Sequence, residues 1–500
     1  MTLFLPVNKA ELYNLRKFKM SSGKNVFVLG AGPCGLSAAL GLLEAGHSVV
    51  VLEREPEVGG QCRTTERSGY RFDLGGHRFI SKDKGLVDRV SKLMGPEFLV
   101  SERRSIIRFM GKDFKYPLEA KDILLKMSPF LSAKCLASYV KSRAESRVVR
   151  KEENTLEEWL VNRYGSEMYE IFFKPYSTKL WGRAPDEISS DWASQRISLL
   201  NMSDVILRLL GLRRKRIRTY ALKFFYPKKG IGDISRRMAA EVERLGGKVR
   251  LNAKVKRVNV AEGKVLSVEY AVGNQDHKVE CDFVVSTIPL PDLIRILNPG
   301  VPDNVRRASS RLESRSLRFM NILLDGVENI SPYTWWYLQD GKYVATRLQE
   351  PKRRSPYSAP EGKTSVMLEI PCSVGDRVWE MEDKKLFERC MADLSDMGLR
   401  LEGKVVDYFT TRLKDAYPVY TMDYRKNRDV LLNHIKSLEN LVSCGRQGLF
   451  DYIFMDDAML MGFEAAKVVS GEMKAHAIYD RKIVKDLLEV KSVVPGEGYS

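Results

Sequence analysis

Short apolar runs flank an apolar helix near the start of the chain. Residues 25–30 (NVFVLG) form a continuous apolar run, which is typical of a buried parallel strand. Residues 33–46 (PCGLSAALGLLEAG) place apolar side chains at helical spacing and end on Gly46, a suitable helix C-cap. Residues 48–53 (SVVVLE) form a second apolar run. Together these segments predict a β-α-β unit.

The pattern changes several times further along the chain. Residues 118–212 are predicted to be largely helical, with Thr155 and Glu158 as a capping box ahead of an amphipathic run. Residues 248–288 alternate apolar and polar positions between turn signals, which predicts a β-meander and then a buried strand that returns to a sheet. Strand-like runs follow within residues 317–371. Residues 440–445 (NLVSCG) predict a last buried strand, followed by a helix from about residue 457.

A glycine motif joins the first strand to the first helix. Gly30, Gly32 and Gly35 have G-x-G-x-x-G spacing. The first permits the tight turn, the second lets the backbone approach a pyrophosphate, and the third lets helix and strand pack closely. The free N–H groups of the helix would face the phosphates. Glu53 ends the second strand, where its carboxylate can accept hydrogen bonds from ribose hydroxyls. This context predicts dinucleotide binding; the alternative is a glycine turn without a ligand.

The glycine-rich signal continues beyond the second strand. A glycine pair and an arginine follow, and then the run FDLGGHR (72–78). This succession resembles the FAD fingerprint of the flavin amine oxidase superfamily, which includes monoamine oxidases, protoporphyrinogen oxidases, phytoene desaturases and UDP-galactopyranose mutases. The resemblance implies that the first pair and the arginine meet the diphosphate, and that the second glycine pair passes beside the flavin ring. The residues concerned are Gly59, Gly60, Arg63, Gly75 and Gly76.

Further segments resemble one branch of that superfamily. KPYSTKLWGRAPDEISSDWASQRI (174–197), FYPKKGIGD (225–233), YPVY (417–420) and GRQGLFDYIFMDDAM (445–459) occur in the order found in the UDP-galactopyranose-mutase-like and protoporphyrinogen-oxidase-like branch. The resemblance covers roughly residues 24–475, and its P-Y-x-x-K-x-W-x-x-x-P block is the most specific part. A second complete G-x-G-x-x-G motif is missing, so we expect no separate NAD(P)H domain.

The resemblance implies roles for individual residues. Arg196 would bind a substrate diphosphate, three tyrosines would line the substrate cleft, and His77 would lie over the flavin ring. The substrate-binding residues are Tyr176, Arg196, Tyr417 and Tyr452. The cofactor-binding residues are Gly30, Gly32, Gly35, Glu53, Gly59, Gly60, Arg63, Gly75, Gly76, His77, Val255, Gly445, Arg446 and Asp456. The alternatives are an ordinary helix salt bridge for Arg196, core packing for the tyrosines and a structural loop role for His77. Apart from His77 near the ring, no side chain is assigned to catalysis.

The chain departs from the mutase pattern on one strand. Classical mutases supply a second phosphate-binding arginine and a tyrosine from the strand around residues 315–326, where this chain has Arg315 and Asp325. Asp325 would repel a diphosphate. Arg318 or Arg347 could replace the missing arginine. Nucleotide-sugar isomerisation is therefore less favoured than oxidation.

These observations predict an α/β fold with a Rossmann-type FAD-binding domain, an inserted mixed β-sheet substrate domain and a helical subdomain. A chain of 500 residues exceeds one ordinary core. We expect a discontinuous FAD domain (24–100, 228–300 and 435–475), a helical and substrate subdomain (101–227) and a substrate domain (301–434). The ligand should lie at their junction, beyond the carboxyl ends of the parallel strands.

Composition limits the partners. The net charge of +18 suits an anionic or nucleotide-linked small molecule, although a solvated basic surface is the simpler interpretation. No nucleic-acid-binding module is visible, and no apolar run reaches the length of a membrane-spanning helix. The first 20 residues lack a long apolar run and a cleavage site, so they do not resemble a signal peptide. The basic stretch 210–225 could touch a membrane surface, but a solvated connector is favoured.

Cysteine and histidine usage adds two exclusions. The seven cysteines form no C-x-x-C or C-x4-C pair, which indicates free thiols, a cytoplasmic location and no flavin disulfide reductase chemistry. The five histidines show no metal-binding spacing, so no metal site is expected. Three hypotheses remain: an FAD-dependent oxidoreductase that removes hydride from its substrate, a redox-neutral sugar mutase that uses reduced FAD, and a non-catalytic FAD-binding protein. The first is favoured.

Overall fold

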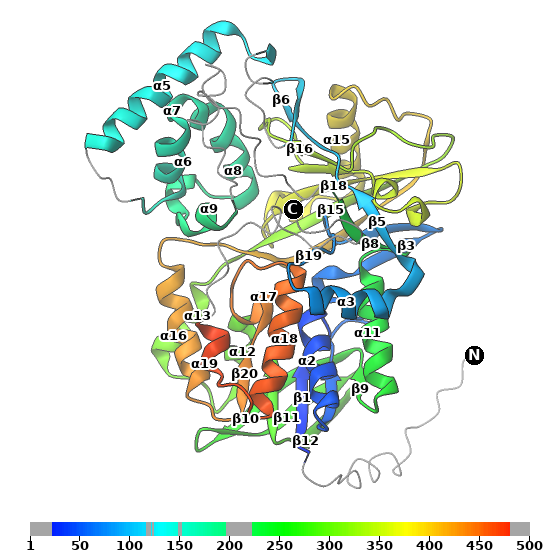
Figure 1. Cartoon of the computed structure of the whole chain (residues 1–500), viewed down its shortest axis with the longest axis vertical. Helices are drawn as coiled ribbons and strands as arrows, with labels where there is room; N and C mark the ends of the chain where they lie inside the picture. The colour runs from blue at the N-terminus through cyan, green and yellow to red at the C-terminus, as the bar shows by residue number, and fades with distance from the viewer. Residues whose placement is uncertain (1–22, 117–121, 123–124, 149–152, 197–222, 481–500) are drawn as a thin grey trace.

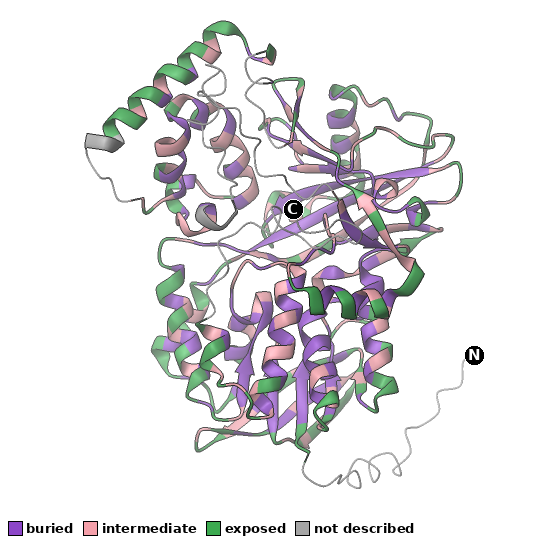
Figure 2. Ribbon diagram, viewed as in Figure 1, coloured by how far each residue is buried: buried purple, intermediate pink, exposed green. Residues whose placement is uncertain are grey.

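The computed structural model describes residues 23–116, 122, 125–148, 153–196 and 223–480. Figure 1 shows a parallel sheet with its helices in the lower half, and a mixed sheet with a helical region beside it in the upper half. Strands of both sheets are largely buried (Figure 2). This arrangement confirms the predicted fold class. The basic stretch 210–225 lies mostly outside the described residues, and the first 22 residues lie wholly outside them.

The lower half is built on five parallel strands in the order β20-β13-β1-β2-β9. They are β20 (Leu441–Ser443), β13 (Phe283–Ser286), β1 (Asn25–Leu29), β2 (Ser48–Leu52) and β9 (Lys248–Arg250). The predicted β-α-β unit is present, with α2 (Pro33–Glu44) between β1 and β2. The helices of this half are α3 (Lys84–Met94), α11 (Gly232–Arg244), α12 (Leu290–Ile296), α13 (Asp303–Ser310), α16 (Tyr424–Lys436), α17 (Gly445–Gly448), α18 (Met455–Val469) and α19 (His476–Tyr479).

The predicted meander forms a separate sheet in the order β12-β11-β10-β14. Its members are β10 (Ala253–Ala261), β11 (Lys264–Val272), β12 (Gln275–Glu280) and the short β14 (Leu297–Asn298). The chain then returns through β13 to the parallel sheet, as the sequence pattern indicates. Two ribbons pair β3 (Thr64–Arg67) with β4 (Tyr70–Asp73) and β5 (Phe98–Glu102) with β8 (Lys223–Pro227).

The upper half holds a seven-stranded sheet in the order β19-β15-β18-β17-β16-β6-β7. The strands are β19 (Val405–Pro418), β15 (Ser314–Leu324), β18 (Thr364–Cys372), β17 (Arg347–Gln349), β16 (Trp335–Leu338), β6 (Ser105–Phe109) and β7 (Lys112–Lys115). Helices α14 (Arg377–Glu380) and α15 (Asp383–Asp396) accompany it. The range 101–227 is therefore not purely helical, because the β6–β7 hairpin joins this sheet through β16. Its turn needs positive φ at Met110 and Gly111, a signal that the apolar pattern alone does not carry.

The helical region comprises α5 (Pro129–Val148), α6 (Leu156–Tyr164), α7 (Ser166–Met168), α8 (Lys174–Trp181) and α9 (Asp191–Arg196). The predicted capping box is present: Thr155 Oγ1 accepts from Glu158 N at 3.1 Å, and the Glu158 carboxylate accepts from Thr155 N at 3.0 Å. Lys179 on α8 connects this region to the sheet. Its buried Nζ donates to four carbonyl oxygens between β16 and β17, and burial lowers its pKa to about 8. The lysine of the most specific sequence block is thus a structural residue.

Helices α2 and α18 cross at glycines. A Cβ built on Gly462 of α18 would lie 2.2 Å from Cys34 O, and one on Gly41 of α2 would lie 2.8 Å from the Ala466 Cβ. Helix α18 therefore packs its backbone against α2.

We predict that Gly462→Ala destabilises the fold by about 2 kcal/mol or more, because the added methyl group overpacks a backbone-to-backbone contact. Gly85→Ala, in α3, is the matched control. The nearest atom to a Cβ there is a side-chain oxygen of Asp83 at 3.3 Å, so we expect no comparable loss. Chemical denaturation of both variants measures the difference. Equal stabilities would contradict the helix crossing.

Candidate functional site

The glycine loop after β1 is shaped by two contacts within the protein. Gly30 has φ +102°, and a Cβ there would lie 2.6 Å from Thr287 Oγ1. A Cβ on Gly35 would lie 1.9 Å from Gly30 O. These two positions need glycine for the turn and for the close packing of helix on strand, whatever the loop binds.

Gly32 is different, because the protein itself does not require glycine there. Its φ of −75° and ψ of 175° are open to any residue. The nearest heavy atom to a Cβ at Gly32 is Gly60 Cα, 4.0 Å away. Gly32 is also the N-cap of α2 and supplies no side-chain cap. The space in front of this helix end is thus lined by backbone from two glycines, which fits a pyrophosphate held by helix N–H groups.

Glu53 lies at the carboxyl end of β2 beside this loop. Its buried carboxylate accepts hydrogen bonds from Ala31 N at 2.8 Å and from Glu55 N at 3.0 Å. Ala253 N donates to Glu53 O at 2.7 Å, which brings the half-buried Val255 on β10 to the same edge. Two backbone donors fix the carboxylate and leave acceptor capacity for ribose hydroxyls.

Arg63 approaches the same region from the second glycine pair. Its Nη1 lies 3.0 Å from Glu55 Oε2, while its buried Nε has no partner among the described residues. Gly59 and Gly60 both have positive φ. An incompletely bonded guanidinium beside a backbone cradle fits an anionic ligand such as a diphosphate.

The Gly75–Gly76 loop rests on a buried polar network. Asp73 accepts from Thr64 Oγ1 at 2.7 Å, from Ile231 N at 3.1 Å and from the Tyr226 hydroxyl. Arg354 Nη1 donates to Gly75 O at 3.3 Å. The same Arg354 atom also donates to Gln349 Oε1 at 2.9 Å. The loop is therefore held by Arg354, which also reaches Gln349 on β17 of the upper sheet.

At Gly76 the structure gives a reason for glycine that sequence reasoning missed. A Cβ there would lie 2.8 Å from Trp335 Nε1 and 3.0 Å from Arg347 Nη1. Glycine thus allows the upper sheet to approach the loop, in addition to any role toward a cofactor. Trp335 and Arg347 belong to the short strands β16 and β17. The apolar residues around these strands indicate that they are buried, but nothing in the sequence indicates that they contact this loop.

His77 follows directly. Burial lowers the pKa of its imidazole to about 4, so the ring is neutral at physiological pH. Its Nδ1 is buried and has no partner among the described residues. A neutral ring with a free nitrogen next to the glycine pair fits a role at the cofactor and not a salt bridge.

Three predicted cofactor residues come from the last part of the chain. A Cβ on Gly445 would lie 2.8 Å from Cys34 Sγ, so α17 contacts the start of α2. Cys34 Sγ and Cys444 Sγ lie 3.6 Å apart as free thiols, a pair that sequence spacing could not reveal. Arg446 donates to Ile453 O at 3.0 Å and Ala416 O at 2.8 Å, and its guanidinium lies against the ring of Tyr452.

Asp456, in the first turn of α18, is buried with one carboxylate oxygen unpartnered among the described residues. Burial, aided by the neighbouring Asp457 charge, raises the pKa of Asp456 to about 7. A buried carboxyl group without a full set of partners is costly for the free protein. A ligand hydroxyl would satisfy it.

The structure brings three predicted substrate residues together. The Tyr417 and Tyr452 rings stack with their centroids 5.5 Å apart. Burial raises the pKa of Tyr176, and the nearby Glu369 and Tyr452 raise it further. Arg347 makes a bidentate ion pair with Glu369, with Nη2–O distances of 2.6 and 2.7 Å. The Tyr417 hydroxyl donates to Glu369 at 2.9 Å. Glu369 was not predicted, although a carboxylate inside the apolar run TSVMLEIP signals a buried partner.

Arg315 and Arg318 lie on β15, the strand that departs from the mutase pattern, and they bind groups outside the tyrosine cluster. Arg315 Nε donates to Leu180 O at 3.0 Å, and Arg318 pairs with Asp383 while donating to the carbonyls that precede it. Asp325 pairs with Lys363 at 2.7 Å. Of the candidate replacements, only Arg347 adjoins the tyrosines. Arg196 ends α9, and its side chain lies outside the described residues.

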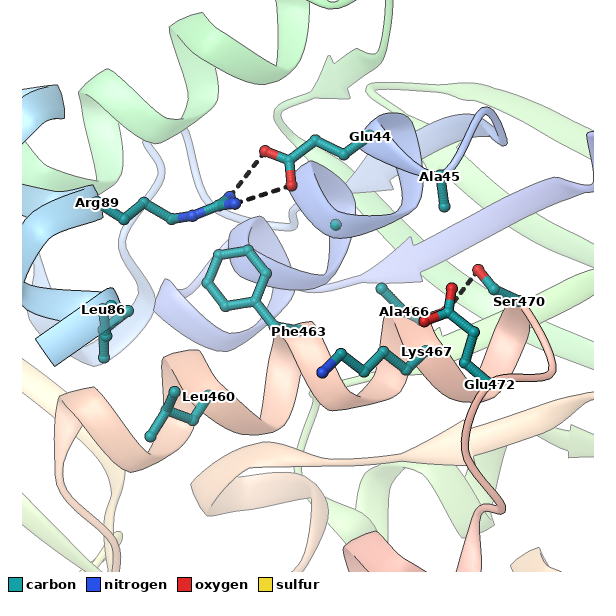
Figure 3. A pocket seen from close by; sticks show the side chains of 12 residues that line it. Glu44, Ala45, Leu86, Arg89, Leu460, Phe463, Ala466, Lys467, Ser470 and Glu472 are labelled. Carbon is teal, nitrogen blue, oxygen red and sulfur yellow. Dashed lines mark hydrogen bonds and ion pairs between the residues drawn. The ribbon is translucent and has the colours of Figure 1, made fainter. Parts of the chain in front are cut away.

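One surface hollow lies away from this site. A cavity of about 420 Å³ is bounded by α2, α3 and α18 (Figure 3). Arg89 in its wall is neutralised by Glu44 at 2.8 Å and covers the Phe463 ring. The hollow shares no residue with the glycine loops or the tyrosine cluster. Within the described ranges, no group of three potential metal ligands was found, and no helix has the length and apolar character needed to cross a bilayer.

Comparison with known sequences defines the family. Residues 33–470 match the family described as flavin containing amine oxidoreductase. The chain belongs to this family. A probable UDP-galactopyranose mutase from Klebsiella pneumoniae is 26% identical over 170 residues, which cover 33% of this chain and 43% of that protein. The chain thus matches less than half of this relative's length.

Solved structures of the family share the fold. Reduced UDP-galactopyranose mutase superposes with a TM-score of 0.80 at 21% identity, over 94% of this chain and all of that one. A putative protoporphyrinogen oxidase from Exiguobacterium sp. 255-15 gives 0.69 at 18% identity, over 91% of this chain and all of that one. The predicted resemblance to the flavin amine oxidase superfamily is confirmed.

Asp456→Asn tests the carboxyl group at the start of α18. With a folded pKa of about 7 and an unfolded pKa near 3.8, wild-type protein without cofactor loses stability as pH rises between these values, because the unfolded chain releases this proton first. The variant escapes this loss and should gain about 2–4 kcal/mol relative to wild type between pH 4 and pH 8. Denaturation curves at both pH values measure it. A constant difference would contradict the assignment.

Proposed function

We propose that this family member binds FAD and is a flavin-dependent oxidoreductase of a small-molecule substrate. The observation that carries the FAD proposal concerns Gly32, the N-cap of α2. A Cβ there would have no heavy atom nearer than the Cα of Gly60, 4.0 Å away, so the space in front of the helix is open to a pyrophosphate. Glu53 at the ribose end, Arg63 beside the diphosphate, and Asp456 toward the ribityl chain support the same orientation. Gly445, Arg446 and His77 would then border the flavin.

When bound, FAD supplies an acceptor for two electrons as hydride. The protein's part is to bind and orient the substrate beside it. Burial keeps the Tyr176 hydroxyl protonated, and this hydroxyl makes no hydrogen bond to the described residues, so it can donate to a substrate oxygen or nitrogen. Tyr417 is already committed to Glu369. The ion pair of Glu369 with Arg347 therefore positions Tyr417 and neutralises the wall of the cleft.

Charge favours oxidation over isomerisation of a nucleotide sugar. Arg347 is neutralised by a bidentate carboxylate, and Arg446 donates to two carbonyl oxygens. Arg347 therefore offers no unpaired cation to a diphosphate, and the position of Arg446 is fixed by its two carbonyl acceptors and the Tyr452 ring. The mutase remains the second candidate because the similar Klebsiella protein carries that name. A nucleotide-linked substrate would then need Arg196.

We also propose a cytoplasmic location. All seven cysteines are free, including the Cys34 and Cys444 pair whose sulfur atoms lie 3.6 Å apart. A reducing compartment is where such thiols persist.

Gly32→Ala tests FAD binding. The methyl group has room in the protein, so we expect the cofactor-free variant to be as stable as the wild type. The affinity for FAD should fall tenfold or more, because the pyrophosphate needs that space. Gly35→Ala is the contrast, because its methyl group would meet Gly30 O and should impair folding itself. FAD content after reconstitution, read by absorbance, is the measurement. Full occupancy in Gly32→Ala would overturn the proposal.

Tyr176→Phe tests the substrate role. Amines, polyenes, porphyrinogens and nucleotide sugars are mixed anaerobically with the FAD-loaded protein, and flavin bleaching identifies a reducing substrate. With that substrate, Tyr176→Phe should slow flavin reduction by about 10–100-fold, which corresponds to the free energy of one or two hydrogen bonds in a buried site. The FAD content should be unchanged. Tyr343→Phe, whose hydroxyl bonds Asp396, is the control and should reduce normally. If no compound bleaches the flavin, the oxidoreductase proposal fails.

A further inference from the structure

Exposed apolar side chains gather on helix α5 of the upper half and just before it. Of the twelve large hydrophobic residues exposed within the described ranges, four fall in positions 125–140. They are Leu125 (71% exposed), Phe130 (80%), Leu136 (47%) and Val140 (57%). The other eight are spread from residue 100 to residue 422. Scattered exposure is ordinary, but this local concentration is not.

Helix α5 is apolar on two faces. Cys135 and Tyr139 are buried against the rest of the helical region. At 3.6 residues per turn, Leu136, Val140 and Phe130 lie on the opposite side, together with three alanines. The alanines are Ala133, Ala137 and Ala144, all exposed. We call this set the α5 outer face. No acidic side chain falls within it.

Basic residues border the α5 outer face. Lys134 and Lys141 follow one edge and Arg143 the other, and all three are exposed. Lys134 also contacts Glu167 at 2.9 Å, and Arg143 donates weakly to the Tyr139 hydroxyl at 3.4 Å. Glu145 lies beyond the lysine edge, on the side away from the apolar residues. An apolar stripe edged by long cationic side chains is the pattern of a helix that lies in a membrane interface.

We propose that the α5 outer face binds the surface of an anionic lipid bilayer, with the helix parallel to the membrane plane. In the described part of the chain the helix lies at the outer rim of the molecule (Figure 1), and its outward side is exposed along much of its length (Figure 2). A convex rim suits a flat surface better than a peptide ligand. The net charge of +18 attracts anionic lipid and opposes pairing of two copies.

The test uses the full chain loaded with FAD and sedimented with vesicles. Vesicles of phosphatidylcholine with phosphatidylserine should bind the wild type, vesicles of phosphatidylcholine alone should bind less, and added salt should release the protein. Phe130→Ser with Leu136→Ser should lower the vesicle affinity by about tenfold or more, since each change removes an apolar side chain from the interface. Lys141→Glu should weaken binding only to the anionic vesicles.

Leu266→Ser with Val374→Ser is the matched control, because these residues are 52% and 54% exposed on other elements. The control should bind like wild type. The proposal is overturned if wild-type protein ignores anionic vesicles, or if the α5 variant binds as well as the control. It is also overturned if light scattering shows a dimer that the α5 variant abolishes, which would make a second copy the occupant. Thermal unfolding confirms that the exposed substitutions leave the fold intact.

Discussion

The two halves of this protein meet at a strip of backbone that has no room for side chains. Gly76 lies against the Trp335 indole and the Arg347 guanidinium, and Gly75 is held through its carbonyl by Arg354. This loop leads directly from β4, which pairs with β3, so the contact connects the upper sheet to the β3–β4 ribbon. Close contact between backbone and planar side chains thus fixes how the loop and the upper sheet lie against each other.

A buried polar network makes that contact rigid. It runs from Asp73 under the loop, through Arg354 and Gln349, to Glu369 and the tyrosine cluster. Each buried charge in it faces an opposite charge or several donors, so removing one member would leave another unpaired in a medium of low dielectric constant. The same residues that hold the Gly75–Gly76 loop therefore also set the charge around the tyrosine cluster. Because Arg347 and Arg354 face carboxylates of the protein, fewer arginines can bind an anionic ligand than the sequence alone suggests.

Sequence alone predicted the parts of the structure that depend on local spacing. The β-α-β unit, the capping box at Thr155 and the returning strand β13 follow from apolar periodicity and from short motifs. The tight turn at Gly30 and the close packing at Gly35 are present as predicted, whereas the role of Gly32 toward a pyrophosphate stays a prediction. The partner of Arg347 and the packing of Gly76 could not, because both arise from strands far apart in the sequence whose register is set by tertiary contacts. The β6–β7 hairpin was missed for the same reason: its parallel partner β16 lies more than 200 residues away.

The contact between α2 and α18 has a consequence for the order of folding. Gly41 and Gly462 belong to helices near opposite ends of the described chain, yet each lies where its helix meets the other: Gly462 lies against Cys34 O of α2, and Gly41 lies against Ala466 of α18. A ribosome completes the first β-α-β unit long before it makes α18, so the nascent unit leaves an apolar helix face uncovered for most of synthesis. The loop that this contact closes is among the longest the chain can form, and such contacts form late. The face of α2 that packs against α18 therefore stays uncovered until that late helix has been made.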